Sequence, residues 1–197
     1  MSHDIGEVQV LSKSGMGIGP GLPLSASAGG IEELRCDIQR LMDMEAIKQT
    51  KHAYFRCIDT ANWEELGSIC HPDLKVHYIG GGYEYRMANR EEFLSAMKQA
   101  FHSEAVARHN GHMPEIQILS ENEATGIWYL YDHFWSLNAN HLTHGTALYW
   151  DSYVKVNGSW LIKATSYRRI YQMNEKLHEK PQLVSHYLSE HGIKVNG

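Results

Sequence analysis

The second half of the chain contains long runs rich in Ile, Trp, Tyr and Val, and this composition restricts the possible folds more than any other feature. The runs begin at about Ala107 and are separated by polar breaks at 120–122, 138–140 and 157–158. β-Branched and aromatic runs bounded by turn residues are typical of strands. Asn157-Gly158 is the strongest turn signal, because both residues tolerate the positive φ of a type I′ hairpin. The sequence therefore predicts four antiparallel strands joined by hairpins.

The first half of the chain has helical periodicity. Apolar residues recur at helical spacing from Ile31 to about Thr60, which predicts two consecutive helices or one bent helix. Asn62 and Asn89 are candidate N-caps of two later helices, and Asn89 is followed by Glu92 as in a capping box. Helices followed by a meandering sheet predict an α+β fold, in which the helices cover one face of a strongly curved sheet.

A chain of 197 residues is expected to form one domain. Residues 11–30 are rich in Gly, Ser and Pro, which lose too much backbone entropy to fold alone, so 1–30 is predicted to be an extended N-terminal arm. The domain is expected at 31–172. A C-terminal tail with a short helix, 173–197, completes the chain.

Charge and composition favour a small-molecule ligand. The net charge of −5 and the pI near 6.2 provide no basic field for nucleic acid, and the basic residues form no cluster that would bind anionic lipid. No apolar run is long enough to cross a bilayer, and the N-terminus lacks a secretory signal pattern. Cys36, Cys57 and Cys70 lie in apolar segments, which predicts buried, reduced thiols. We therefore expect a cytoplasmic protein without nucleic-acid or membrane partners.

Four polar residues are predicted to converge on one cavity. If the first two long strands are joined by a four-residue turn at 119–122 and carry no bulge, His109 lies opposite Asp132. If their shared face is the concave one, they meet Tyr54 and Asp59 of the helical region. A carboxylate that orients an imidazole makes it a better base, which suits proton removal next to a carbonyl.

Simpler interpretations exist for the same residues. Asp59 could cap the helix that follows it, in competition with Asn62. Tyr54 could be a core aromatic residue with a hydrogen-bonded hydroxyl. His109 and His112 are separated by three positions, which directs them to opposite faces of a strand, so we expect no metal site.

The chain resembles the SnoaL-like members of the nuclear transport factor two-like superfamily over roughly residues 31–172. The resemblance rests on the segment Asp59-Thr-Ala-Asn-Trp63, on His109 at the start of the first long strand, and on the closing hairpin that contains Asn157-Gly158. Within that superfamily it is similar to scytalone dehydratase, hexachlorocyclohexane dehydrochlorinase and bile acid 7α-dehydratase. The resemblance implies a cone-shaped α+β fold, also described as a cystatin-like barrel, and eliminations that use no metal or organic cofactor.

The resemblance also implies residue roles. Asp59 and His109 match the catalytic dyad of these enzymes, while Tyr54 and Asp132 match an active-site tyrosine and a strand aspartate of the bile acid enzyme.

Relatives carry an arginine on the last strand, and two registers compete for its position. An ideal hairpin would place Arg168 on the same face as Tyr149, whereas comparison with relatives suggests a bulge that turns Tyr167 and Arg169 inward. We take Tyr149 and Arg169 as the candidate substrate-binding residues.

The function implied is a cofactor-independent dehydratase acting on a hydrophobic cyclic hydroxy-carbonyl compound. His109 would be the base and Asp59 would fix its tautomer. Tyr54, and Asp132 if it is protonated, would donate hydrogen bonds to the enolate or the departing hydroxyl. A ketosteroid-isomerase-like enzyme and a non-catalytic small-molecule-binding cone are the alternatives. Relatives suggest a homotrimer, and a curved open sheet leaves surface to cover.

Overall fold

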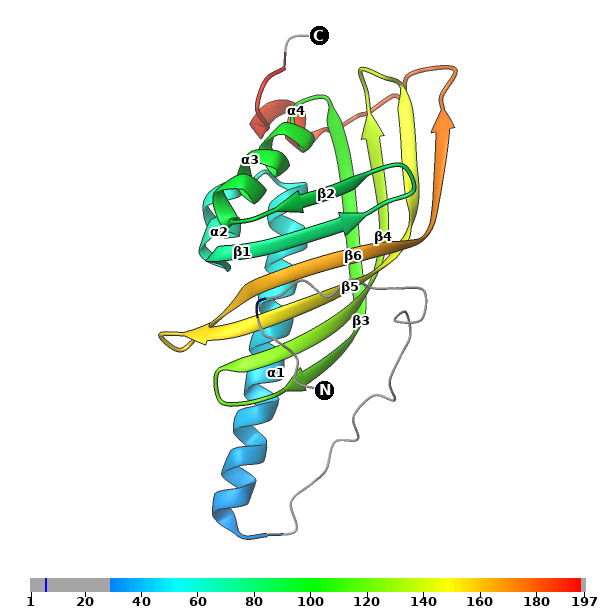
Figure 1. Ribbon diagram of the computed structural model, residues 1–197. Coiled ribbons are helices and arrows are strands. Elements are labelled where there is room, and N and C mark those ends of the chain that lie inside the picture. The colour runs from blue at the N-terminus through cyan, green and yellow to red at the C-terminus, as the bar shows by residue number, and fades with distance from the viewer. Residues whose placement is uncertain (1–5, 7–28, 196–197) are drawn as a thin grey trace.

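The computed structural model describes residue 6 and residues 29–195, so the predicted arm at 1–30 lies almost wholly outside the described residues. The elements in chain order are α1 (Ile31–Asp59), α2 (Trp63–Ser68), β1 (Cys70–Ile79), β2 (Glu84–Met87), α3 (Arg90–Ala100), β3 (Ala105–Ile118), β4 (Glu123–Ser136), β5 (His141–Val156), β6 (Ser159–Lys176) and α4 (Tyr187–His191). The predicted α+β class is confirmed. Six strands form one curved sheet that wraps around α1 (Figure 1).

The sheet has the strand order β2-β1-β6-β5-β4-β3. Strands β3 to β6 form the predicted antiparallel meander. Sequence reasoning did not predict that β1 runs parallel to β6, with β2 antiparallel to β1 at the edge. Among the described strands, β2 and β3 have a neighbour on one side only, so this sheet is open and does not close into a barrel.

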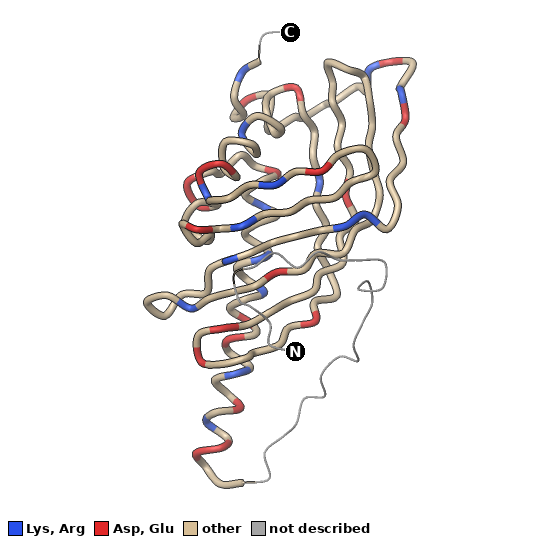
Figure 2. Tube along the Cα trace, viewed as in Figure 1, with Lys and Arg blue, Asp and Glu red and all other residues tan. Residues whose placement is uncertain are grey.

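Helix α1 is one continuous helix of 29 residues rather than two. Its second half is packed inside the curve of the sheet, and its first half projects beyond the sheet (Figure 1). Acidic and basic residues alternate along the projecting half (Figure 2). Its apolar side chains keep the helical spacing but are 48–73% exposed: Ile31, Leu34, Ile38, Leu41 and Met42. The predicted helical spacing is present, but these five side chains, which we call the apolar stripe, lie outside the hydrophobic core.

The three cysteines are all free, and one of them departs from the prediction. Cys57 and Cys70 are buried as expected. Cys36 is exposed, because it lies on the projecting half of α1 where no other part of the described chain covers it.

Both predicted helix N-caps are confirmed. The side chain of Asn62 accepts a hydrogen bond from the backbone N–H of Glu65 at 3.4 Å. Asn89 accepts one from the backbone N–H of Glu92 at 2.9 Å, and the Glu92 carboxylate accepts one from the backbone N–H of Ala88 at 2.8 Å. These bonds satisfy N–H groups that a helix start leaves without intrahelical partners.

His109 lies opposite Asp132 as predicted, but the pairing between the turn and His109 differs from the predicted pairing. Near the turn, Ile118 pairs with Ala124, one residue beyond the predicted partner. A bulge between His112 and Glu115 then shifts the pairing back. The prediction of an unbulged strand was therefore wrong, and its two errors cancel at His109.

The bulged register of the closing hairpin is confirmed. Asn157 and Gly158 have φ values of 50° and 80°, as a type I′ turn requires. Tyr149 pairs with Tyr167 because the register shifts between Ser152 and Tyr153.

The C-terminal tail packs against the start of β3. Leu188 of α4 is 2% exposed and belongs to the hydrophobic core. The backbone N–H of Ser103 donates to the carbonyl of Ile193 at 2.9 Å, which ties the tail down beyond α4. Strand β6 continues to Lys176, past the predicted domain end at 172. Among the helices described, none is long and apolar enough to cross a membrane.

Candidate active site

Asp59 and His109 are joined by two hydrogen bonds. Oδ1 of Asp59 lies 2.6 Å from Nδ1 of His109, and the backbone N–H of His109 donates to Oδ2 at 2.8 Å. Asp59 is the last residue of α1 and His109 lies in β3, so the pair connects the helix end to the sheet. Because a carboxylate accepts and does not donate, Nδ1 carries the shared proton and Nε2 is left as the basic nitrogen.

Aromatic rings hold the imidazole from two sides. The Phe55 ring stacks on His109 with centroids 6.1 Å apart, and the Phe101 ring lies 5.5 Å away. The His109 side chain is 11% exposed, against 22% for Asp59. Gly111 makes room for this arrangement, since a Cβ there would lie 1.9 Å from the Phe55 ring. The imidazole is thus fixed in orientation in a largely apolar setting.

Asp132 lies opposite His109, but its side chain pairs with Arg169. Nη1 of Arg169 donates to Oδ1, and Nη2 donates to Oδ2 at 2.7 Å. The two side chains are 6% and 8% exposed. Burial acts to lower the pKa of Arg169, but the paired carboxylate outweighs it and the pKa rises. Both carboxylate oxygens of Asp132 accept hydrogen bonds from Arg169, so the donor role expected of a protonated Asp132 does not fit this geometry.

Tyr54 belongs to a buried cluster of tyrosines. Its hydroxyl lies 2.5 Å from that of Tyr78, and its ring meets Tyr149 edge to face with centroids 6.2 Å apart. The three residues are at most 4% exposed. Burial, with the neighbouring tyrosines, raises the pKa of Tyr54 and Tyr149 well above the usual value. These hydroxyls therefore remain neutral hydrogen-bond donors near pH 7.

Tyr78 is the site residue that sequence reasoning missed. Its ring stacks on Tyr167 with centroids 4.4 Å apart, and the Tyr167 hydroxyl hydrogen-bonds to that of Tyr83. Leu74, Val76 and Tyr78 alternate along β1, so their side chains lie on one face of the strand. What the sequence did not indicate is the parallel pairing of β1 with β6, which places Tyr78 beside Tyr167.

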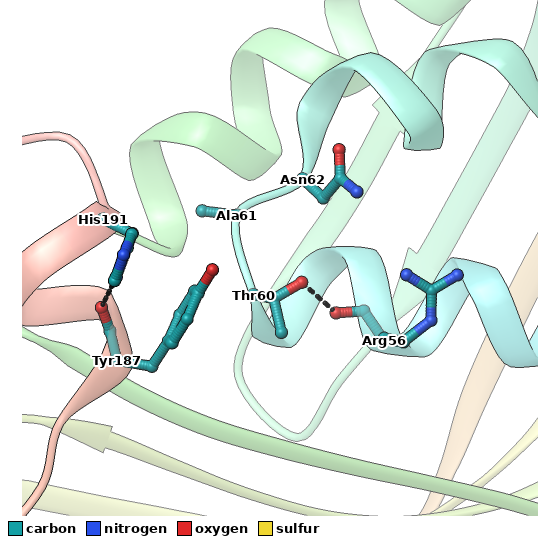
Figure 3. A pocket seen from close by; sticks show the side chains of 6 residues that line it. All are labelled: Arg56, Thr60, Ala61, Asn62, Tyr187 and His191. Carbon is teal, nitrogen blue, oxygen red and sulfur yellow. Dashed lines mark hydrogen bonds between the residues drawn. The ribbon is translucent and has the colours of Figure 1, made fainter.

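A pocket of about 460 Å³ lies between α4 and the end of α1. Three of its lining residues, 60–62, directly follow Asp59 in the sequence. Figure 3 shows Tyr187 and His191 of α4 on one side and the α1–α2 connection on the other. Its lining residues are Arg56, Thr60, Ala61, Asn62, Tyr187 and His191. None of the six predicted site residues lines this pocket.

Within the described part of the chain, no three His, Cys, Asp or Glu side chains are placed to hold a metal ion. His112 stacks on Tyr129 with centroids 5.3 Å apart, whereas His109 contacts Phe55 and Asp59. The two histidines therefore have different neighbours and do not form a ligand pair.

Residues 39–166 match the SnoaL-like domain family, which is more than half of the chain. The chain belongs to this family. It is a member of the nuclear transport factor two-like superfamily, as the resemblance implied.

Solved structures support the same fold. A putative scytalone dehydratase from Novosphingobium aromaticivorans has a TM-score of 0.61 at 21% identity, covering 73% of this chain and 93% of its own. A type 2 hexachlorocyclohexane dehydrochlorinase, LinA, has a TM-score of 0.63 at 20% identity, covering 74% of this chain and 97% of its own. A protein with a cystatin-like fold from Nostoc punctiforme has a TM-score of 0.51 at 20% identity, covering 65% and 91%.

Proposed function

We propose that this SnoaL-like protein is a cofactor-independent lyase that removes water from a hydrophobic cyclic hydroxy-carbonyl compound. The observation that supports this most strongly is the double hydrogen bond between Asp59 and His109. A charged carboxylate on Nδ1 fixes the tautomer and stabilises the imidazolium that forms when Nε2 takes a proton.

In the first step, Nε2 of His109 removes a proton from the carbon next to the substrate carbonyl. The electron pair of the broken C–H bond forms a double bond to the carbonyl carbon, and the π pair of the C=O bond moves onto the oxygen, which becomes an enolate oxyanion. Neutral hydroxyls from the tyrosine cluster donate hydrogen bonds to this oxyanion, which stabilises charge where it develops. Arg169, which is paired with Asp132, adds a fixed positive charge on the face of the sheet that carries His109.

In the second step, the carbonyl re-forms and expels the β-hydroxyl as the new C=C bond is made. The departing oxygen takes the proton that the His109 imidazolium holds, so one water leaves and the base is restored. Proton and electron counts therefore close without an oxidant, reductant or metal.

The ionisable groups argue for an enzyme over a binding cone. A cavity that only binds an apolar molecule is lined mostly by apolar side chains with few polar groups. This chain instead places a carboxylate–imidazole pair, a carboxylate–guanidinium pair and a tyrosine cluster between α1 and one face of the sheet.

The experiment is a panel of cyclic and steroid-like β-hydroxy ketones incubated with the purified protein. Products are resolved by mass, because loss of water lowers the mass whereas isomerisation leaves it unchanged. We expect at least one dehydrated product that the variant His109→Ala does not form. A product of unchanged mass would identify an isomerase, and tight binding without any conversion would identify a binding protein.

We further propose that the chain forms a homotrimer. The open sheet and the apolar stripe on the projecting half of α1 leave surface that a second and third copy would cover. Sedimentation at micromolar concentration should give three times the chain mass, and a monomer would contradict the proposal.

A further inference from the structure

A third pair of charged side chains, Lys51 and Asp151, lies beside the tyrosine cluster, and the proposed reaction does not use it. Nζ of Lys51, on α1, lies 2.8 Å from Oδ2 of Asp151, on β5, and both side chains are 0% exposed. Lys51 is one helical turn before Tyr54, so both project from the same face of α1.

The Asp151 carboxylate accepts hydrogen bonds from two further side chains. Thr165 donates its hydroxyl hydrogen to Oδ1 at 2.6 Å, and Tyr153 donates to Oδ2 at 2.8 Å. The indole N–H of Trp128 donates to the Tyr153 hydroxyl at 3.0 Å, which directs the Tyr153 hydrogen towards Asp151. A carboxylate that accepts two hydroxyl hydrogens can balance the charge of a buried ammonium group.

The ammonium group of Lys51 is packed against aromatic faces. Nζ lies 3.8 Å from the centroid of the Tyr149 ring, 4.3 Å from that of Tyr54 and 5.1 Å from that of Phe55. Burial lowers the pKa of Lys51, and the neighbouring Asp151 opposes that shift. A cation over a phenol ring draws electron density from it, so the phenol becomes a stronger hydrogen-bond donor.

Stability alone gives no reason for this pair. A buried ion pair can often be replaced by apolar residues of similar volume with little loss, because desolvation cancels most of the Coulombic attraction. A fully buried pair directly behind candidate active-site residues is therefore a candidate for a functional role.

We propose that Lys51 is a positioning residue that polarises Tyr54 and Tyr149 and fixes their rings for hydrogen bonding to the substrate oxyanion. Lys51 touches no substrate atom in this account and acts through the two phenols. The kinetic part of this inference rests on the proposed function. It predicts an effect on the chemical step, because hydrogen bonds to an oxyanion strengthen as its charge develops.

The first test is a titration that needs no substrate. Tyr54 is replaced by a fluorinated tyrosine, whose phenol ionises at lower pH, and its ionisation is followed by absorbance. The titratable groups that face Tyr54 or Lys51 are Lys51 itself from α1, Cys70 and Tyr78 from β1, and Tyr149 and Asp151 from β5. In the protein with Lys51 intact, the ammonium favours the phenolate.

Three backgrounds are compared with that protein. Lys51→Met should raise the pKa of the probe most, because it removes the cation and leaves the Asp151 charge. Lys51→Met with Asp151→Asn should raise it less, and it keeps the test decidable if an unpaired buried carboxylate prevents folding. Tyr153→Phe is the matched control, since it removes a hydrogen bond to the same carboxylate and keeps the ion pair. The probe pKa should not rise in the control.

The second test is kinetic. With a substrate found in the panel above, Lys51→Met/Asp151→Asn should lower kcat about tenfold and leave KM nearly unchanged, whereas Tyr153→Phe should change neither. A probe pKa that does not rise without Lys51, or a kcat that is retained, overturns the inference. Absence of turnover by the wild-type protein instead refutes the proposed function, and the titration still decides the role of Lys51.

Discussion

Two carboxylates near His109 have different kinds of partner: Asp59 at the end of α1, and Asp132 opposite His109 in the sheet. Asp59 binds an imidazole, which can accept a further proton at Nε2, and the Asp59 side chain is 22% exposed. Asp132 binds a guanidinium, which stays charged, and its side chain is 6% exposed. One pair can therefore change charge during a reaction cycle, while the other supplies a constant field. Under the proposed function, this difference assigns proton transfer to His109 and a fixed charge arrangement to the Asp132–Arg169 pair.

The largest expected effect follows from removing the titratable partner. His109→Ala should lower turnover about 10²–10⁴-fold, because a general base acts on the barrier, while folding and ligand binding persist. The matched control is His112→Ala, since His112 lies on the same strand and stacks on Tyr129 away from Asp59. Steady-state rates of both variants test this, and a His109→Ala protein with the wild-type rate would show that His109 is not the base.

Asp59→Asn should be almost as damaging to kcat. The amide is close in size to the carboxylate and can still hydrogen-bond to His109, but it has no charge with which to stabilise an imidazolium. Circular dichroism and the thermal midpoint of the variant should stay close to those of the wild type. If kcat is unchanged, the charge of Asp59 has no part in the reaction.

For Asp132, the second carboxylate, the expected effect is on the stability of the protein. Asp132→Asn leaves the Arg169 charge buried without its counter-charge, which should lower the free energy of unfolding by about 3 kcal/mol. Denaturant unfolding monitored by fluorescence measures this. A variant as stable as the wild type would mean that water reaches the Asp132–Arg169 pair in solution and that the pair is not a buried, fixed ion pair.

The smallest expected effect comes from the start of α2, which Asp59 was also a candidate to cap. Asn62 is the residue that caps α2, so Asn62→Ala should cost about 1 kcal/mol of stability and leave turnover unchanged. Thermal unfolding and the steady-state rate are measured on the same preparation. A large loss of rate would show that the α1–α2 junction contributes to catalysis through its conformation.

The sequence predicted features that depend on local chemistry. The Asn157-Gly158 hairpin and the Asn62 and Asn89 caps follow from side-chain geometry within a few residues, and the structure contains them. The Asp59–His109 contact was predicted from a family resemblance, and the pairing of His109 with Asp132 from a register argument. The register was right only because a longer turn and a bulge at 113–114 compensate each other.

Features that depend on distant pairing were not predicted. Tyr78 enters the site through the parallel contact of β1 with β6, and no local pattern specifies that neighbour. Lys51 was not considered, because a lysine on a helix is normally solvated and its partner is 100 residues later. Asp132 was expected to face the substrate, whereas Arg169 occupies both of its oxygens.

The most direct test of the central claim is a double-mutant cycle on kcat with wild type, His109→Ala, Asp59→Asn and the combined variant. If Asp59 acts only through His109, removal of the carboxylate charge has no further effect once the imidazole is gone. The account therefore predicts that the combined variant is no slower than His109→Ala alone. A combined loss equal to the product of the two single losses would show that the residues act independently and would contradict the dyad.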